Sequence, residues 1–136
     1  MNLPKFDAKA YCVPQQSPTH DNETLAGWLM GLTKAQRDHI RDYLGDHDTA
    51  NKWLYKKLLN LAMMSAARIC IIPIQDWLGL DNTNRMNTPG TVDVNWSWRL
   101  LPGQVTDQLG EEILSVAMRY GRTNWDAVKS AKKRKA

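Results

Sequence analysis

Amide and carboxylate side chains gather in the middle of the 136-residue chain, in a stretch that also holds three tryptophans. The polar side chains are Gln75, Asp76, Asn82, Asn84, Arg85, Asn87 and Asn95, and the tryptophans are Trp77, Trp96 and Trp98. Sugar hydroxyls donate and accept hydrogen bonds, as amides do, and a flat indole covers the apolar face of a pyranose. This stretch therefore has the composition of a sugar-binding surface.

An apolar run from Ile69 to Ile74 directly precedes these polar residues. Five or six apolar, mostly β-branched residues that end at a polar loop predict a strand buried on both faces, which is typical of a parallel sheet. A second β-leaning piece lies around residues 11–19. Because a parallel strand needs parallel neighbours and helices on both faces, the predicted fold requires further strands beyond these two.

Helical patterns with capping signals occupy most of the remaining sequence. A short helix is predicted from a polar cap near residue 23 to Gly31. Thr33 and Gln36 form a capping box for a helix that ends at Leu44, where Gly45 can adopt the left-handed conformation. The other predicted caps are Asp48 or Thr49, Thr106 and Asn124, each before a further helix.

Five motifs follow one another in a fixed order. They are Thr19-His20-Asp21-Asn22, Gly27-Trp28, the run from Ile72 to Leu80, Arg85-Met86-Asn87-Thr88-Pro89-Gly90 and Asn95-Trp96-Ser97-Trp98-Arg99. In these motifs the chain resembles the C-terminal part of the 4-α-glucanotransferases, the amylomaltase or disproportionating-enzyme family of glycoside hydrolases. The resemblance covers most of the chain and is weak over residues 1–16 and from Thr123 onward.

The resemblance implies an α/β fold, the C-terminal part of a (β/α)8 TIM barrel. Residues 1–136 would be the C-terminal segment of a catalytic barrel, with its last two strand–helix units plus the C-terminal helices, and residues 123–136 a basic tail. The segment would be mostly helical, with about two short parallel strands. Barrel active sites lie at the C-terminal ends of the strands, and both polar clusters follow a predicted strand end.

The resemblance also implies a chemistry and roles for individual residues. The family transfers α-1,4-glucan segments between oligosaccharides by a retaining double displacement, which needs a nucleophile and an acid/base about 5–5.5 Å apart. By motif, Asp21 is a third carboxylate that stabilises the transition state, while His20 and Asn87 bind substrate. Since the family's nucleophile and acid/base lie on earlier strands, the 136-residue chain alone is expected to be inactive.

The residues of these motifs can also be interpreted as purely structural. Taken alone, Asp21 is a helix cap and Asn87 a turn residue. Trp96 and Trp98 alternate and would face opposite ways in an extended segment, so at most one is expected to stack on sugar. Asp76 is expected to cap the turn from Trp77 to Leu80.

Four further features are interpreted as structural. Trp28 is expected in the core, and Arg85 and Arg99 in structural roles. Asp46-His47-Asp48 is interpreted as a solvated helix start rather than a metal site. We predict no metal and no cofactor.

Charge and composition bear on location and partners. The net charge is +4, but five basic residues lie among the last eight, so the basicity belongs to the tail. Cys12 and Cys70 lack metal-ligand spacing, and no apolar run approaches the roughly 20 residues that span a bilayer. We predict a cytoplasmic protein that binds α-1,4-glucan oligosaccharides (maltooligosaccharides), without nucleic-acid or membrane partners. The alternatives are a free-standing helical module that binds glucan or nucleic acid, or a decayed partial gene.

Overall fold

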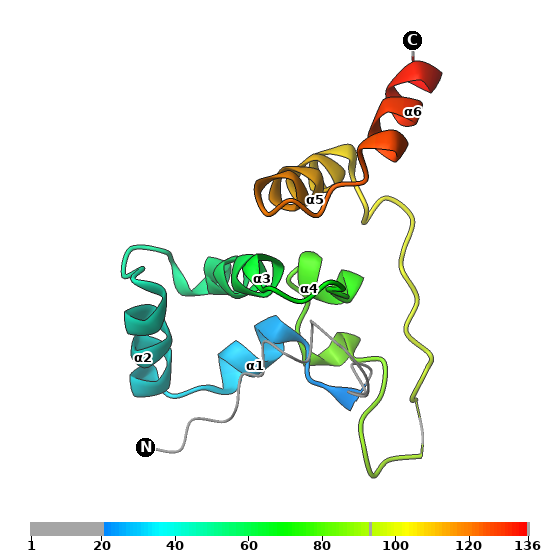
Figure 1. Ribbon diagram of the computed structural model, residues 1–136. Coiled ribbons are helices and arrows are strands. Elements are labelled where there is room, and N and C mark those ends of the chain that lie inside the picture. The colour runs from blue at the N-terminus through cyan, green and yellow to red at the C-terminus, as the bar shows by residue number, and fades with distance from the viewer. Residues whose placement is uncertain (1–20, 93, 136) are drawn as a thin grey trace. The chain divides into compact units, whose positions relative to one another are not determined.

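The computed structural model describes residues 21–92 and 94–135. The chain divides into two compact units, Met1–Gln104 and Val105–Ala136, which are described separately. Figure 1 shows that the described part of the first unit consists of helices joined by extended segments and turns. The second β-leaning piece, residues 11–19, lies outside the described residues, as does His20.

Two capped helices begin the first unit. Helix α1 covers Leu25–Gly31, and the hydroxyl of its N-cap, Thr24, accepts a hydrogen bond from the Gly27 amide. Helix α2 covers Lys34–Leu44 with the complete Thr33/Gln36 capping box, and Gly45 closes it at φ 61°. These starts and ends are confirmed, because each depends on residues no more than a few positions apart.

Helix α3, Leu54–Met64, supplies the centre of the hydrophobic core and follows the 3-10 turn η3, Asn51–Trp53. Its side chains Leu54, Leu58 and Leu59 are fully buried and pack with residues of α1 and α2, while Trp28 lies half-buried against them. Burying one such leucine stabilises the fold by about 1.5–3 kcal/mol. The predicted cap at Asp48 or Thr49 was wrong, because η3 begins after Ala50 without a side-chain cap.

The predicted strand at residues 69–74 does not form. Residues 69–73 are not assigned to a strand, and Ile74 begins helix α4, Ile74–Trp77. Ile69 and Ile71 are 58% and 56% exposed, so the expected burial on both faces was also wrong. Cys70 and Ile72 pack against the buried Ala62 of α3. A strand requires a neighbouring strand to pair with, and the described residues contain none.

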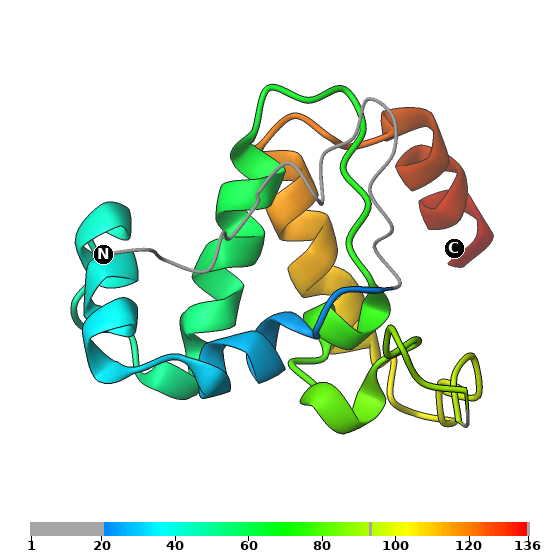
Figure 2. The same cartoon turned by 90° about the horizontal axis from the view of Figure 1, so that it is seen from below.

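A second 3-10 turn, η4 at Asn82–Asn84, lies against α1 although more than 50 residues separate them (Figures 1 and 2). Helix α3 packs against both α1 and α4. The segment from α4 through η4 is therefore held against the start of α1, and this is the arrangement that positions the candidate site.

The second unit contains helix α5, Asp107–Arg119, and helix α6, Trp125–Lys135. Thr106 caps α5 and Asn124 accepts a hydrogen bond from the Ala127 amide, as predicted. Gly121 follows α5 at φ 68°. In the described part of the chain, none of the helices has the length and apolarity needed to cross a membrane.

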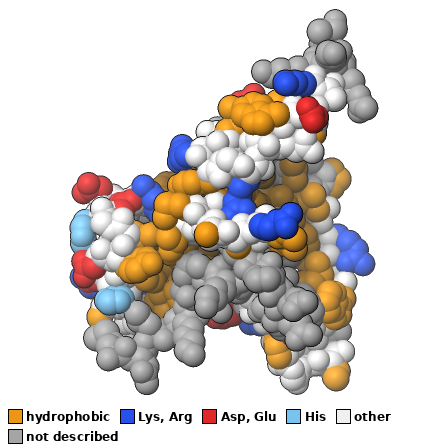
Figure 3. Space-filling view, in the orientation of Figure 1, with side chains coloured by type: hydrophobic (Ala, Val, Ile, Leu, Met, Phe, Trp, Pro, Cys, Tyr) orange, Lys and Arg blue, Asp and Glu red, His pale blue; other side chains and the backbone are white. Residues whose placement is uncertain are grey.

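Hydrophobic side chains also reach the surface, where Figure 3 shows them as separate orange patches. In the first unit the most exposed are Val92 and Val94, in the loop between Gly90 and Trp96.

Candidate functional site

Asp21 lies in the turn before α1, and a segment more than 60 residues away holds it at two points. Arg85 Nη2 donates a hydrogen bond to the Asp21 carbonyl oxygen at 2.9 Å. Asn87 Nδ2 donates to Asp21 Oδ1 at 2.5 Å. Backbone and carboxylate are therefore both fixed by the Arg85-Met86-Asn87 motif. The structure brings together two of the predicted site residues, Asp21 and Asn87.

The same turn is anchored at its far end by Asn82. Asn82 Oδ1 accepts hydrogen bonds from the Thr24 amide at 3.1 Å and the Thr24 hydroxyl at 3.3 Å. Its Nδ2 donates to Glu23 Oε1 at 2.7 Å. Asn82 sits at the start of η4, which Asp81 caps, and hydrogen bonds from Thr83 hold the pKa of the Asp81 carboxyl below its usual range.

Asp76 caps a different element from the one expected. Its Oδ1 accepts a hydrogen bond from the Leu25 amide at 2.7 Å, and its side chain is 2% exposed. The Leu25 amide is an unsatisfied donor of the first turn of α1, so a buried carboxylate there stabilises the helix start. Asp76 thus joins α4 to α1.

Trp96 has an unusual backbone conformation, with φ 63°, the only positive φ at a non-glycine residue of the described chain. Its amide donates to the Met86 carbonyl at 2.7 Å, and its carbonyl accepts from Arg99 Nη1 at 2.8 Å. Asn95 also closes the preceding loop, because its side chain bonds the Thr88 amide and the Thr91 carbonyl. A left-handed tryptophan costs energy and persists only where its surroundings hold it.

The two tryptophans of the Asn-Trp-Ser-Trp-Arg motif have different environments, although the segment is not the extended one that the alternation assumed, since Trp96 lies in a turn. Trp96 is 53% exposed and lines a pocket. Trp98 is half-buried, and its Nε1 donates to Asn84 Oδ1 at 3.0 Å. Arg99 donates to the carbonyls of Trp96 and Trp98, which supports its structural assignment. Of the two tryptophans, it is Trp96 that lines this pocket.

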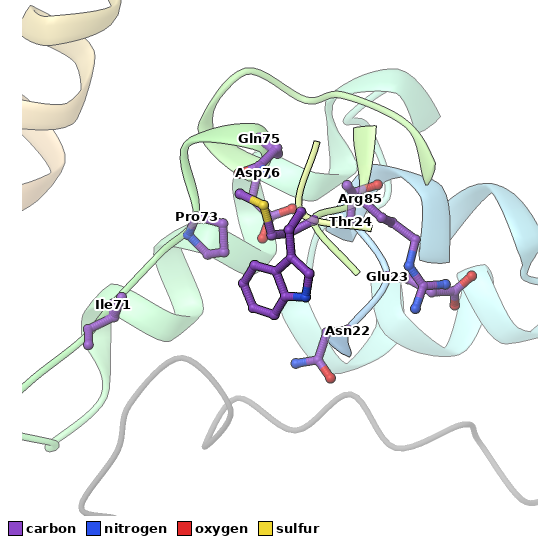
Figure 4. Close-up of a pocket in the computed structure, with 10 residues that line it drawn as sticks. Asn22, Glu23, Thr24, Ile71, Pro73, Gln75, Asp76 and Arg85 are labelled. Carbon is purple, nitrogen blue, oxygen red and sulfur yellow. The ribbon is translucent and has the colours of Figure 1, made fainter. Parts of the chain in front are cut away.

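The pocket beside the Asp21 turn has a volume of about 270 Å³. Its lining consists of Asn22, Glu23, Thr24, Ile71, Pro73, Gln75, Asp76, Arg85, Met86 and Trp96. Figure 4 shows Ile71 and Pro73 on one side and Asn22, Glu23 and Arg85 on the other. A sugar ring in such a pocket can place its apolar face against the apolar wall. Its hydroxyls can then bond the amides, carboxylates and guanidinium on the other side.

Asp46, His47 and Asp48 lie in the loop that leads from α2 to η3. Asp46 binds the Thr49 amide and hydroxyl and forms an ion pair with Lys57 Nζ at 2.6 Å. His47 Nε2 lies 3.5 Å from Asp42 Oδ1. Over residues 21–92 and 94–135, no three histidine, cysteine or carboxylate side chains converge as metal ligands would.

Sequence reasoning missed the part that Asn82 and Asp76 play in holding the Asp21 turn. Both belong to the polar residues that follow the apolar run, so composition marked the region. Their partners lie 51 to 59 residues away, which no local pattern reveals.

Comparisons with known proteins identify the family of this chain. Residues 4–105 match the family model of the 4-alpha-glucanotransferases. The chain is 38% identical to the 4-alpha-glucanotransferase of Synechocystis over 104 residues, which covers 76% of this chain and 20% of that protein. It is 36% identical to the 4-alpha-glucanotransferase of Thermus thermophilus over 105 residues, covering 73% and 20%.

A solved structure is similar as well. The amylomaltase from Streptococcus agalactiae in complex with acarbose superimposes with a TM-score of 0.70 at 27% identity, over 77% of this chain and 21% of that one. The chain thus spans about a fifth of the length of these relatives. The free-standing module and the decayed gene are not favoured by these matches. The chain belongs to the 4-alpha-glucanotransferase family.

Proposed function

We propose that this chain forms one wall of a 4-α-glucanotransferase active site, and that Asp21 is the transition-state-stabilising carboxylate of that wall. The observation that carries this proposal is the double hold on Asp21, with Arg85 on its carbonyl and Asn87 on its carboxylate, beside the pocket. A carboxylate with a fixed orientation stabilises positive charge without reorganising as the reaction proceeds.

The reaction proposed for the whole enzyme is a double displacement on an α-1,4-glucan. A carboxylate nucleophile attacks the anomeric carbon while an acid gives its proton to the departing glycosidic oxygen. An acceptor hydroxyl then attacks the glycosyl-enzyme and passes its proton to the same acid/base residue. Asp21 would stabilise the oxocarbenium-like charge in both steps. The nucleophile and the acid/base would come from the part of the family's proteins that this chain does not match.

The substrate contacts of His20 and Asn87 are proposed from the motifs, since Asn87 is not among the pocket-lining residues, and the contact of Trp96 is proposed from the pocket. His20 and Asn87 would bind sugar hydroxyls, and Trp96, exposed at the pocket, would stack on a sugar face. Trp98 is less suited to stacking because it is half-buried and its indole N–H is engaged by Asn84. The similar amylomaltase was solved with acarbose, which supports an oligosaccharide as the ligand class.

The fold proposal places residues 1–136 at the C-terminal end of a (β/α)8 barrel, as its last two strand–helix units and C-terminal helices, with 123–136 as a basic tail. In that setting residues 69–73 would gain the neighbouring strand that they lack in the described chain. The exposed Ile69 and Ile71 support this, because a barrel strand presents alternate side chains to its interior. A cytoplasmic location remains part of the proposal.

A chimera tests the proposed role of Asp21. In this chimera the 136-residue chain replaces the segment to which it aligns in the Thermus thermophilus relative, and glucose release from maltotriose measures transfer. Asp21→Asn keeps the shape and removes the charge, so kcat should fall by about 10²–10³-fold with little change in KM. Asp48→Asn, at an exposed carboxylate that is not part of the pocket, is the matched control.

Measurements on the chain itself complete the test. Acarbose should quench its tryptophan fluorescence, and Trp96→Ala should remove most of that quenching while Trp98→Ala removes little. An Asp21→Asn chimera as active as its parent would overturn the role of Asp21. Glucose release from maltotriose by the 136-residue chain alone would overturn the proposal that the nucleophile lies elsewhere.

A further inference from the structure

We infer that Asn82 is a positioning residue for Asp21, acting through the backbone of the turn that joins Asp21 to α1. This inference rests on the proposed function, since Asp21 must be the reacting carboxylate for its position to affect the rate. Asn82 has no place among the pocket-lining residues and contacts the turn from outside the pocket. Its role is therefore separate from substrate contact.

Hydrogen bonds hold the turn from Asp21 to Thr24 at both of its ends. Arg85 holds the Asp21 carbonyl, and Asn82 holds the Glu23 carboxylate and the Thr24 amide. Asn22, between them, is exposed at the pocket. Without Asn82, the bond from the Leu25 amide to Asp76 still holds the start of α1, but the peptide groups of Asn22 and Glu23 gain freedom to rotate, and the Asp21 carboxylate would move with them. A displacement of about 1 Å is enough to cost roughly 10²-fold in rate.

A substitution at Gly27 tests the contact between Asn82 and the turn independently. A Cβ at residue 27 would lie 2.2 Å from Asn82 Oδ1 and 2.3 Å from its Cγ. Gly27 lies inside α1, where alanine is the better helix former. Gly27→Ala should therefore displace the Asn82 side chain while it favours the helix itself, so the expected effects on rate and on helix stability have opposite signs.

Kinetics of the chimera provide the first test. Asn82→Ala and Gly27→Ala should each lower kcat by about 10–100-fold with KM changed less than about 3-fold. The double variant should match Asn82→Ala alone, because the truncated side chain leaves room for the new methyl group. Asn51→Ala, which removes an amide that accepts from Arg41 at 2.9 Å, is the matched control and should leave kcat unchanged.

An exchange of donor and acceptor tests the Glu23 contact. Asn82→Asp places two carboxylates against each other and should lower kcat, whereas Asn82→Asp with Glu23→Gln restores one donor and one acceptor and should recover most of the loss. A role in stability alone predicts that kcat per folded molecule stays constant across this series while the unfolding midpoint changes.

A measurement without turnover applies to the chain itself. The side-chain NH₂ signal of Asn87 in an ¹⁵N spectrum reports its bond to Asp21, and it should shift in Asn82→Ala and in Gly27→Ala but not in Asn51→Ala. An unmoved Asn87 signal, or unchanged kcat in both variants while Asp21→Asn is impaired, would overturn the inference and leave the proposed function standing. An Asp21→Asn chimera with full activity would instead refute the proposed function.

Discussion

Asn87 donates a 2.5 Å hydrogen bond to Asp21 across 66 residues of sequence. Because the donor is neutral and the acceptor is a carboxylate, the bond orients the charge without neutralising it. The bond gives Asn87 a second role beside the proposed substrate contact. Asp21 is therefore held by the same motif that the resemblance marks as substrate-binding.

Replacing Asn87 should separate orientation from charge. In the chimera, Asn87→Ala should lower kcat by about 10–100-fold, because the carboxylate keeps its charge and loses its fixed rotamer. Asn87→Asp should be worse, since it sets a second carboxylate against Asp21. Glucose release from maltotriose measures both, with Asn51→Ala as the control. A parent-like kcat for both Asn87→Ala and Asn87→Asp would show that the Asp21 contact is unimportant for the rate.

Local signals were sufficient for much of the fold. The Thr33/Gln36 capping box, the left-handed Gly45, and the caps at Thr106 and Asn124 all involve partners within about five residues, and all are confirmed. The strand at 69–74 failed for the opposite reason. Its composition fits a buried strand, but strand formation depends on a neighbour that no residue of the described chain provides.

The candidate site could be predicted only in part. The resemblance named Asp21 and Asn87 together, and the structure brings them into contact. Residue composition alone showed a polar, aromatic stretch without saying which side chains meet. The roles of Asp76 and Asn82 could not be predicted, because their bonds to α1 span more than 50 residues. His20 lies outside the described residues, so its role stays a prediction.

The buried carboxylate of Asp76 should matter for stability. Asp76→Ala leaves the Leu25 amide without its acceptor and should cost about 1–3 kcal/mol in the free energy of unfolding. Asp76→Asn retains a carbonyl oxygen at the same place and should cost less. Urea unfolding of the chain, followed by circular dichroism, measures both. A larger loss for the asparagine than for the alanine would contradict this account of the cap.

The Asp46–Lys57 pair should make stability depend on pH. The hydrogen bond from Lys57, with those from Thr49, holds the pKa of the Asp46 carboxyl well below its usual range. An Asp with a depressed pKa in the folded state stabilises the fold above its unfolded pKa of about 4, and that contribution is lost as the pH falls toward the folded value. The stabilising effect is thus complete near neutrality.

Asp46→Asn should therefore be less stable than the parent chain at pH 7, and the difference should shrink as the pH is lowered below about 4. Urea midpoints from pH 7 to pH 2.5 provide the measurement. Lys57→Gln should reduce the same difference, and the double variant should lose less than the two single losses combined, because the residues act as a pair. A difference that grows on acidification would have the wrong sign.

Two glycines with nearly the same backbone conformation allow a matched test of packing. Gly79 and Gly45 have φ of 65° and 61°, so alanine at either position pays a similar left-handed strain, about 1–2 kcal/mol. They differ in surroundings. A Cβ at Gly79 would lie 2.6 Å from Cζ of the buried Tyr55, whereas a Cβ at Gly45 would meet nothing within 4 Å.

Gly79→Ala should therefore destabilise the chain by about 1–3 kcal/mol more than Gly45→Ala, since the Tyr55 ring is confined in the core and must be displaced. Urea unfolding compares the two variants under the same conditions. Tyr55→Leu removes the ring atoms at the contact, so Gly79→Ala should cost less in that background than in the parent chain. Equal destabilisation by the two alanines would mean that α4 and α3 do not pack as closely around Gly79 as the structure has them.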